Sequence, residues 1–190
     1  MKIMSKKRKL IEQAKIISET NNGEIDDFLG DENISKDLLE LLYDFNIENW
    51  LNDRDDFENN WSIGLIISNP QSSKSLLKKV FKHLENTLYE DKEVQFSDLA
   101  KNINTKLGDE DWAKKLYHIV EEIVFSDGYI EKKGISKALD LAVNITTSLK
   151  DISWGRTLFE KIEKLENINK VAFATNLAKS FNDDTEWCKR

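Results

Sequence analysis

The sequence predicts an all-α fold of stacked antiparallel helical hairpins, like those of a helical repeat or α-solenoid, with about nine or ten helices. Three observations favour this fold class. The 190 residues include only one proline and seven glycines, too few for the turns that a sandwich or barrel needs every 8 to 12 residues or so. Apolar residues recur at helical spacing along most of the chain. A set of residues also repeats at an offset of 42.

Apolar stripes place the helices along the chain. The residue pair Asn69 and Pro70 is typical of a helix N-cap followed by proline in the first turn. The run from Ser62 to Ser68 has the composition of a strand, but an isolated strand would have nothing to pair with. The main stripes before the repeat are Leu10, Ala14 and Ile17; Leu38, Leu41, Leu42 and Phe45; Phe57, Trp61 and Leu65; and Leu77, Val80, Phe81, Leu84 and Leu88.

An internal repeat covers the C-terminal half, most clearly over residues 97–190 of a single all-helical domain, 1–190. In each copy a Leu-Ala pair is followed by an Asp-x-x-Trp-small pattern. A third copy starts at Leu177, and we expect it to resume at Asp184 and Trp187. The first two copies, offset by 42 at every position, are Leu99, Ala100, Ile103, Leu107, Asp109, Trp112, Ala113 and Leu116, then Leu141, Ala142, Ile145, Leu149, Asp151, Trp154, Gly155 and Leu158.

The repeat predicts helical hairpins at 97–125 and 139–165. A helix ends near Gly108, where glycine tolerates the left-handed conformation. Asp109 caps the next helix, and so does Asp151 in the second copy. We expect Trp112 and Trp154 to be core residues, with small neighbours that let two helices approach closely.

The stacked helix pairs, with small and aromatic residues at fixed positions, resemble tetratricopeptide-like and HEAT-like solenoids. The offset of 42 differs from the roughly 34 residues of the tetratricopeptide repeat. The resemblance implies an architecture that commonly binds proteins on a concave face. A fainter resemblance, to TerB-like helical domains of tellurite resistance, rests on the run Ser126-Asp127-Gly128-Tyr129-Ile130. It implies no metal role for this chain, because Gly134 stands where that motif usually has an acid.

Charge is distributed unevenly along the chain. The first 20 residues carry +4, with a basic N-terminal tail at 1–9; residues 21–60 carry two bases and thirteen acids; and residues 61–190 are neutral. The single Cys188 excludes an intrachain disulfide framework. Neither a signal peptide nor an apolar stretch of membrane-spanning length is recognisable. A cytoplasmic location and no membrane partner are therefore expected.

Patterns for catalysis are absent from the sequence. His83 lies in a lysine-rich helix and His118 beside an apolar stripe, and neither is part of a recognisable triad. The glycines are scattered singly, so no phosphate-binding loop is present. A cysteine-based zinc site would need more than Cys188. We expect no enzyme activity, no cofactor and no metal; an enzyme would require a pocket that gathers His118 with carboxylates.

The leading hypothesis is a non-enzymatic, helical-repeat protein-binding module for a basic partner. Concentrated carboxylates attract a cationic surface and accelerate its capture. A small acidic helical protein also suits an immunity-type inhibitor of a toxin such as a nuclease, whose own substrate is a polyanion. The predicted partner-binding residues are Glu24, Asp26, Asp27, Asp31, Glu32, Asp53, Asp55, Asp56 and Glu58.

Two alternatives remain open. Lys74, Lys78 and Lys82 share one helix face at i, i+4 and i+8 and could bind nucleic acid backbone. Nucleic acid is the less favoured partner because the sequence pI is about 5.0. A TerB-like stress-response domain is the other alternative.

Overall fold

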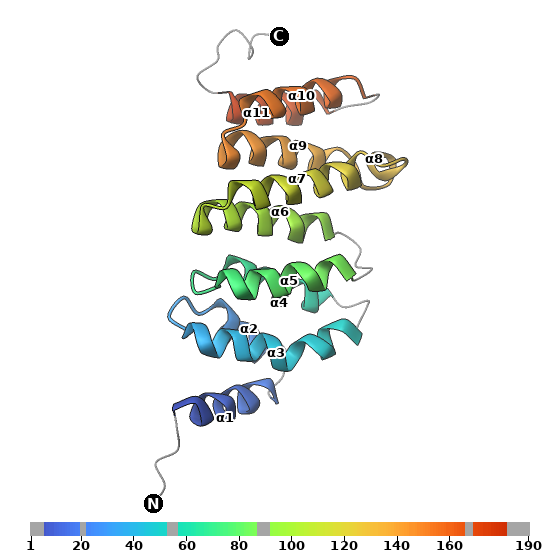
Figure 1. The fold of residues 1–190 in the computed structure, drawn as a ribbon. Helices are drawn as coiled ribbons and strands as arrows, with labels where there is room; N and C mark the ends of the chain where they lie inside the picture. The colour runs from blue at the N-terminus through green and yellow to red at the C-terminus, as the bar shows by residue number, and fades with distance from the viewer. Residues whose placement is uncertain (1–5, 20–21, 53–56, 87–91, 166–168, 182–190) are drawn as a thin grey trace, which may run out of the picture. The chain divides into compact units, whose positions relative to one another are not determined.

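The computed structural model describes residues 6–19, 22–52, 57–86, 92–165 and 169–181. The predicted all-α fold class is confirmed: these residues form eleven α-helices and two π-helical turns, with no strand among them (Figure 1). The expected number of helices was too low, partly because the five-residue helix Tyr129–Lys133 is too short to show an apolar stripe. The chain divides into two compact units, unit 1 at 1–98 and unit 2 at 99–190. Unit 2 begins close to residue 97, the predicted start of the repeat.

Unit 1 is a set of packed helices in which α1 lies against α3 and α2 lies against α4. The core includes Leu42 and Leu77 from the predicted apolar stripes, together with Leu29 and Ile66, which no predicted stripe contained; all four are fully buried. Residues 6–9 of the predicted basic tail are the start of a helix, and the run Ser62–Ser68 is helical. The helices of this unit are α1 (Lys6–Ser18), α2 (Asn22–Gly30), α3 (Lys36–Asn52), α4 (Phe57–Ser68), α5 (Lys74–Asn86) and the larger part of α6 (Lys92–Asn102).

The start of α5 differs from the prediction. The hydroxyl of Ser73, rather than the side chain of Asn69, caps the helix by accepting a hydrogen bond from the backbone N–H of Leu76 at 3.0 Å. The Asn69 Oδ1 accepts from the backbone N–H of Gln71 at 2.8 Å. Asn69 therefore closes a tight turn before the helix.

Unit 2 shows that the repeat is structural. Positions 42 residues apart adopt the same backbone conformation: both π-helical turns end in a left-handed residue, Gly108 at φ 62° and Lys150 at φ 58°. Asp109 and Asp151 then cap the following helices, as predicted, each accepting from the backbone N–H three residues on. After the end of α6, the elements are η1 (Ile103–Leu107), α7 (Glu110–Val124), α8 (Tyr129–Lys133), α9 (Ser136–Asn144), η2 (Ile145–Leu149), α10 (Ile152–Glu163) and α11 (Lys170–Ser180).

The third copy of the repeat is described only in part. Leu177 is a buried residue of α11, and Phe181 directly after the helix is buried as well. Their positions agree with the expected Leu-Ala helix of a third copy. Asp184 and Trp187, which would complete the pattern, lie outside the described residues.

The small residue of the repeat is buried in both copies. Ala113 is fully buried, and Gly155 lies where α10 crosses η2. A Cβ atom added to Gly155 would lie 2.0 Å from Cγ2 of Thr146, far inside van der Waals contact. The predicted close approach of helices is therefore confirmed at Gly155, where no larger residue fits without displacement.

Trp112 and Trp154 were predicted to be core residues, but both are only partly buried and lie at the edge of the core. Trp154 donates its indole Nε1–H to Glu121 of α7 at 3.0 Å. An indole carries an apolar ring and a polar N–H, and a position at the edge of the core satisfies both.

Among the described residues, no helix is long and apolar enough to cross a membrane.

Candidate functional site: an acidic turn

The net charge of the chain lies entirely in one unit. Unit 1 has thirteen Lys and Arg against twenty Asp and Glu, whereas unit 2 has fifteen of each. Electrostatic attraction of a charged partner is therefore a property of unit 1.

The nine predicted partner-binding residues are described to different extents. The side chains of Asp26, Asp27, Asp31 and Glu32 are placed by the structure. The side chains of the other five are not described. Asp53, Asp55 and Asp56 lie outside the described residues, and for Glu24 in α2 and Glu58 in α4 only the helical backbone is described.

The described carboxylates gather around the connection between α2 and α3. Asp27 lies on α2, Asp31 and Glu32 follow its end, and Asp37 lies in the first turn of α3; we call these four residues the acidic turn. All four side chains are exposed. Asp37 also suits its position electrostatically, because the N-terminal end of a helix favours negative charge.

Local hydrogen bonds shape this connection. Asp31 Oδ1 accepts from the backbone N–H of Asn33 at 2.9 Å, which is the pattern of an Asx turn. Ser35 Oγ accepts from the backbone N–H of Leu38 at 3.3 Å and caps α3. The short polar side chains therefore fix the turn while leaving most of its carboxylates exposed to solvent.

The connection between α4 and α5 holds the acidic turn through hydrogen bonds to its backbone. Asn69, only 3% exposed, donates from Nδ2 to the carbonyl oxygen of Leu29 at 2.8 Å and to that of Asp31 at 3.1 Å. Gln71 donates from Nε2 to the carbonyl oxygen of Glu32 at 3.2 Å. These bonds hold the backbone of the acidic turn in one position. Sequence reasoning missed this role of Asn69, since nothing in the local pattern reveals a partner about 40 residues away.

Several other carboxylates within residues 21–60 serve the fold. Asp26 accepts from Ser62 Oγ at 2.6 Å and ties α2 to α4. Glu40 accepts from Ser73 Oγ at 2.6 Å, and Asp44 pairs with Lys79 at 2.7 Å, which ties α3 to α5. By contrast, Asp27, Glu32 and Asp37 make no side-chain hydrogen bond or ion pair within the described part of the chain. Among the described carboxylates of residues 21–60, these three are available to a partner.

A pocket of about 480 Å³ lies beside the acidic turn, between α1 and α3. Asp37, Glu40 and Asp44 line it from α3, and Lys6 and Lys7 line it from α1. The first three recur at i, i+3 and i+7, a one-face spacing that could have identified them from sequence. Because lysines line the other wall, the charge of this pocket is partly compensated, whereas that of Asp27 and Glu32 is not.

The basic face predicted for nucleic acid is present on α5. Lys74, Lys78 and Lys82 are exposed as the i, i+4, i+8 spacing predicts. Their neighbour Lys79 is occupied by its ion pair with Asp44. This salt bridge links α5 to α3.

His118 does meet a carboxylate, at the surface of unit 2. Its Nδ1 lies 3.9 Å from Glu121 Oε2, and its ring stacks on Trp154 at 4.2 Å between centroids. Lys161 completes the group at 3.4 Å from Glu121 Oε1 and 3.8 Å from the centre of the Phe125 ring. The His118 side chain is 61% exposed. The group ties α7 to α10.

His83 is buried in unit 1, and burial lowers its pKa from 6.5 to about 4. It is therefore neutral at physiological pH. Within the described residues, no three His, Cys, Asp or Glu side chains come together as a metal site.

No protein-family model, no curated protein and no solved structure compared with the chain matches it.

Proposed function

We propose that this chain is a non-enzymatic helical binding module that captures a basic protein through the acidic turn. The observation that carries the proposal is the set of exposed carboxylates of Asp27, Glu32 and Asp37, which bind nothing else in the described fold. They belong to the unit that carries the whole net charge of −7. A cationic partner would relieve the mutual repulsion of these groups.

Rigidity of the backbone supports the same function. Asn69 and Gln71 donate to the carbonyl oxygens of Asp31 and Glu32 in the acidic turn and to that of Leu29 at the end of α2. Little backbone freedom is therefore left to lose on binding. Binding to a preorganised surface costs less conformational entropy than binding to a flexible one. The acidic turn therefore suits rapid and tight capture.

The chemistry of the partner follows from charge. Proteins that act on nucleic acid carry basic surfaces, because their substrate is a polyanion. An acidic protein that covers such a surface would inhibit the enzyme. We therefore propose an immunity-type inhibitor of a toxin such as a nuclease, acting in the cytoplasm, as the specific form of this function.

Nucleic-acid binding is the second candidate, and the exposed lysine face of α5 is the observation that favours it. It ranks lower because unit 1 as a whole carries negative charge and would repel a polyanion.

Affinity capture from the native source tests the proposal. The full chain, the variant Asp27→Asn/Glu32→Gln/Asp37→Asn and a control variant from unit 2 are immobilised side by side. The control, Asp127→Asn/Glu131→Gln/Asp140→Asn, removes the same charge from three exposed carboxylates of unit 2. We expect a basic protein to be retained by the wild type and the control and lost from the acidic-turn variant.

Two results would contradict the proposal. One is retention of the same protein by all three chains, since the acidic turn would then be an ordinary solvated surface. The other is recovery of nucleic acid that is lost on Lys74→Gln/Lys78→Gln/Lys82→Gln, which would establish the second candidate.

A further inference from the structure

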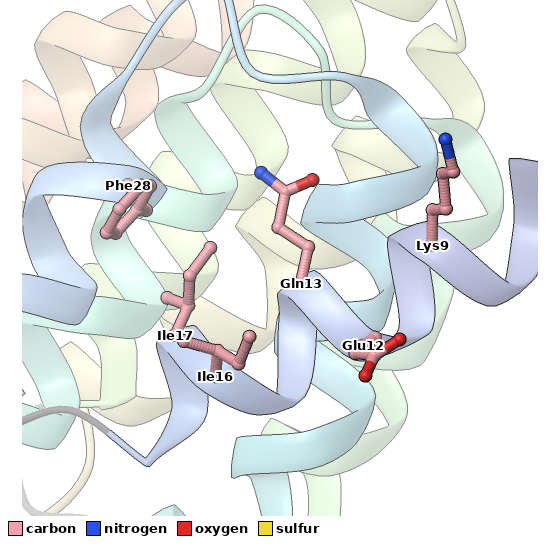
Figure 2. Close-up of a pocket in the computed structure, with 6 residues that line it drawn as sticks. All are labelled: Lys9, Glu12, Gln13, Ile16, Ile17 and Phe28. Atoms are coloured by element: carbon pink, nitrogen blue, oxygen red, sulfur yellow. The ribbon is translucent and has the colours of Figure 1, made fainter.

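A second pocket, of about 420 Å³, lies between α1 and α2, and no acidic-turn residue lines it. Ile16, Ile17 and Phe28 form its apolar end, and Lys9 lies at its other end (Figure 2). Ile16 is 62% exposed and Phe28 38% exposed. Two of the most exposed large apolar side chains in the described residues thus meet at one place. An exposed apolar pocket with a polar rim is typical of a site that binds a partner.

The polar lining of this pocket consists of Lys9, Glu12 and Gln13, all on α1. Figure 2 shows Lys9 and Gln13 projecting to the same side of α1, with Glu12 toward the other edge of the helix. Helix α1 carries five Lys and Arg and a single Glu. Lys6 and Lys7 line the pocket beside α3, but Lys9 has no hydrogen bond or ion pair within the described residues. A carboxylate is the group that complements it.

We propose that the pocket between α1 and α2 docks a segment of a partner protein that carries a carboxylate and a bulky apolar side chain. The apolar side chain enters between Ile16 and Phe28, and the carboxylate pairs with Lys9. Lys9 and Ile16 are seven residues apart, so the two contacts are separated by about 10 Å along the helix. A partner helix meets this spacing with the two side chains two turns apart.

A protein segment fits this pocket better than an anionic membrane or a second copy of the chain. A bilayer is an extended negative surface, and it would repel the remaining charges of unit 1, whose net charge is −7. The apolar contact is also a hollow, which receives a protruding side chain rather than inserting into lipid. A second copy that met the first through α1 would bring two positively charged helices together.

The test uses the isotope-labelled full chain and a synthetic helical peptide of about 15 residues, long enough to be helical when alanine-rich, with Leu and Glu two turns apart. We expect saturable shifts of backbone amide signals in α1 and α2. Replacing Leu by Ala, or Glu by Lys, in the peptide should weaken binding about fivefold or more. The protein variant Lys9→Glu should reverse the preference and bind the Lys peptide better than the Glu peptide.

Control variants separate this site from other surfaces. Ile16→Ser should lose the peptide, whereas Val171→Ser should bind it normally, since Val171 is 77% exposed on α11 of unit 2. The acidic-turn variant should also bind normally, so failure here and failure of the proposed function are distinguishable. Both serine substitutions are at exposed positions and should leave thermal unfolding nearly unchanged.

Four results would overturn the inference. They are absence of saturable shifts with the Leu and Glu peptide, equal binding of the Glu and Lys peptides by the wild type, binding to phosphatidylserine vesicles that Ile16→Ser abolishes, and a dimer in sedimentation that Ile16→Ser dissociates. The third would assign the pocket to a lipid surface and the fourth to a second copy.

Discussion

The two units use different means to build helical structure. Unit 2 repeats one local design: two π-helical turns, two left-handed residues and two aspartate caps stand at an offset of 42 residues. Unit 1 is joined by side chains that reach across the fold, such as Asn69 to the carbonyl of Leu29 and Asp26 to Ser62. The regular unit is electrically neutral, whereas the irregular unit carries the net charge and the proposed binding surfaces.

The largest expected effect is at Gly155 in unit 2. Gly155→Ala should destabilise the protein by about 2 to 3 kcal/mol, because the new methyl group overlaps Thr146 Cγ2, even though alanine has the higher helix propensity. Chemical denaturation measures the change. Thr146→Ser removes that methyl group and keeps the hydroxyl, so the alanine should cost less than about 1 kcal/mol in the Thr146→Ser background. An equal cost in both backgrounds would mean that the contact is not what requires glycine.

The matching test in unit 1 is Asn69→Ala. The change leaves buried carbonyl oxygens without their donor, and we expect a loss of about 2 to 3 kcal/mol in the free energy of unfolding. Hydrogen exchange should also become faster at the acidic turn, while exchange in α9 and α10 stays unchanged. Uniformly faster exchange would show that Asn69 supports the whole chain rather than this connection.

The buried His83 should make unit 1 sensitive to acid. Its folded pKa of about 4 lies below the usual 6.5, so the unfolded state binds more protons between these values, and stability falls as the pH is lowered from about 6.5 toward 4. The stability that depends on neutral His83 is fully present above pH 6.5. His83→Gln should remove this pH dependence. The free energy of unfolding of the variant should therefore change less with pH across this range than that of the wild type. A wild type and a variant with parallel pH profiles would contradict this account.

The caps of the repeat should behave as equivalents. Asp109→Ala and Asp151→Ala should each cost about 1 kcal/mol, as loss of an aspartate N-cap usually does. Asp151 Oδ2 also lies 3.7 Å from Lys114, but the pair is partly exposed and should add little. A difference of more than about 1 kcal/mol between the two variants would break the equivalence of the copies.

Local signals explain what could be predicted. The scarcity of proline and glycine indicated helices. The Asp-x-x-Trp pattern located the two aspartate caps of unit 2, Asp109 and Asp151, because caps depend on residues three positions apart. The concentration of acids at residues 21–60 predicted one acidic surface. That pattern does not distinguish Asp26, which ties two helices, from Asp27 beside it, because the difference depends on Ser62. For the same reason, the role of Asn69 and the position of Trp154 at the core edge appeared only in the structure.

Association kinetics test the proposed role of the acidic turn most directly. The captured basic partner is mixed with the wild type, with Asp27→Asn/Glu32→Gln/Asp37→Asn, with Asp53→Asn/Asp55→Asn/Asp56→Asn and with the unit 2 control, at increasing salt. Charge steering acts mainly on the association rate and is screened by salt. We predict a rate at low salt that is at least about tenfold lower for the acidic-turn variant, with a flatter salt dependence, and a wild-type rate for the control. The Asp53 triple variant shows whether the second predicted acidic segment adds to this effect. Wild-type association by the acidic-turn variant at low salt would contradict the claim that unit 1 binds its partner through this turn.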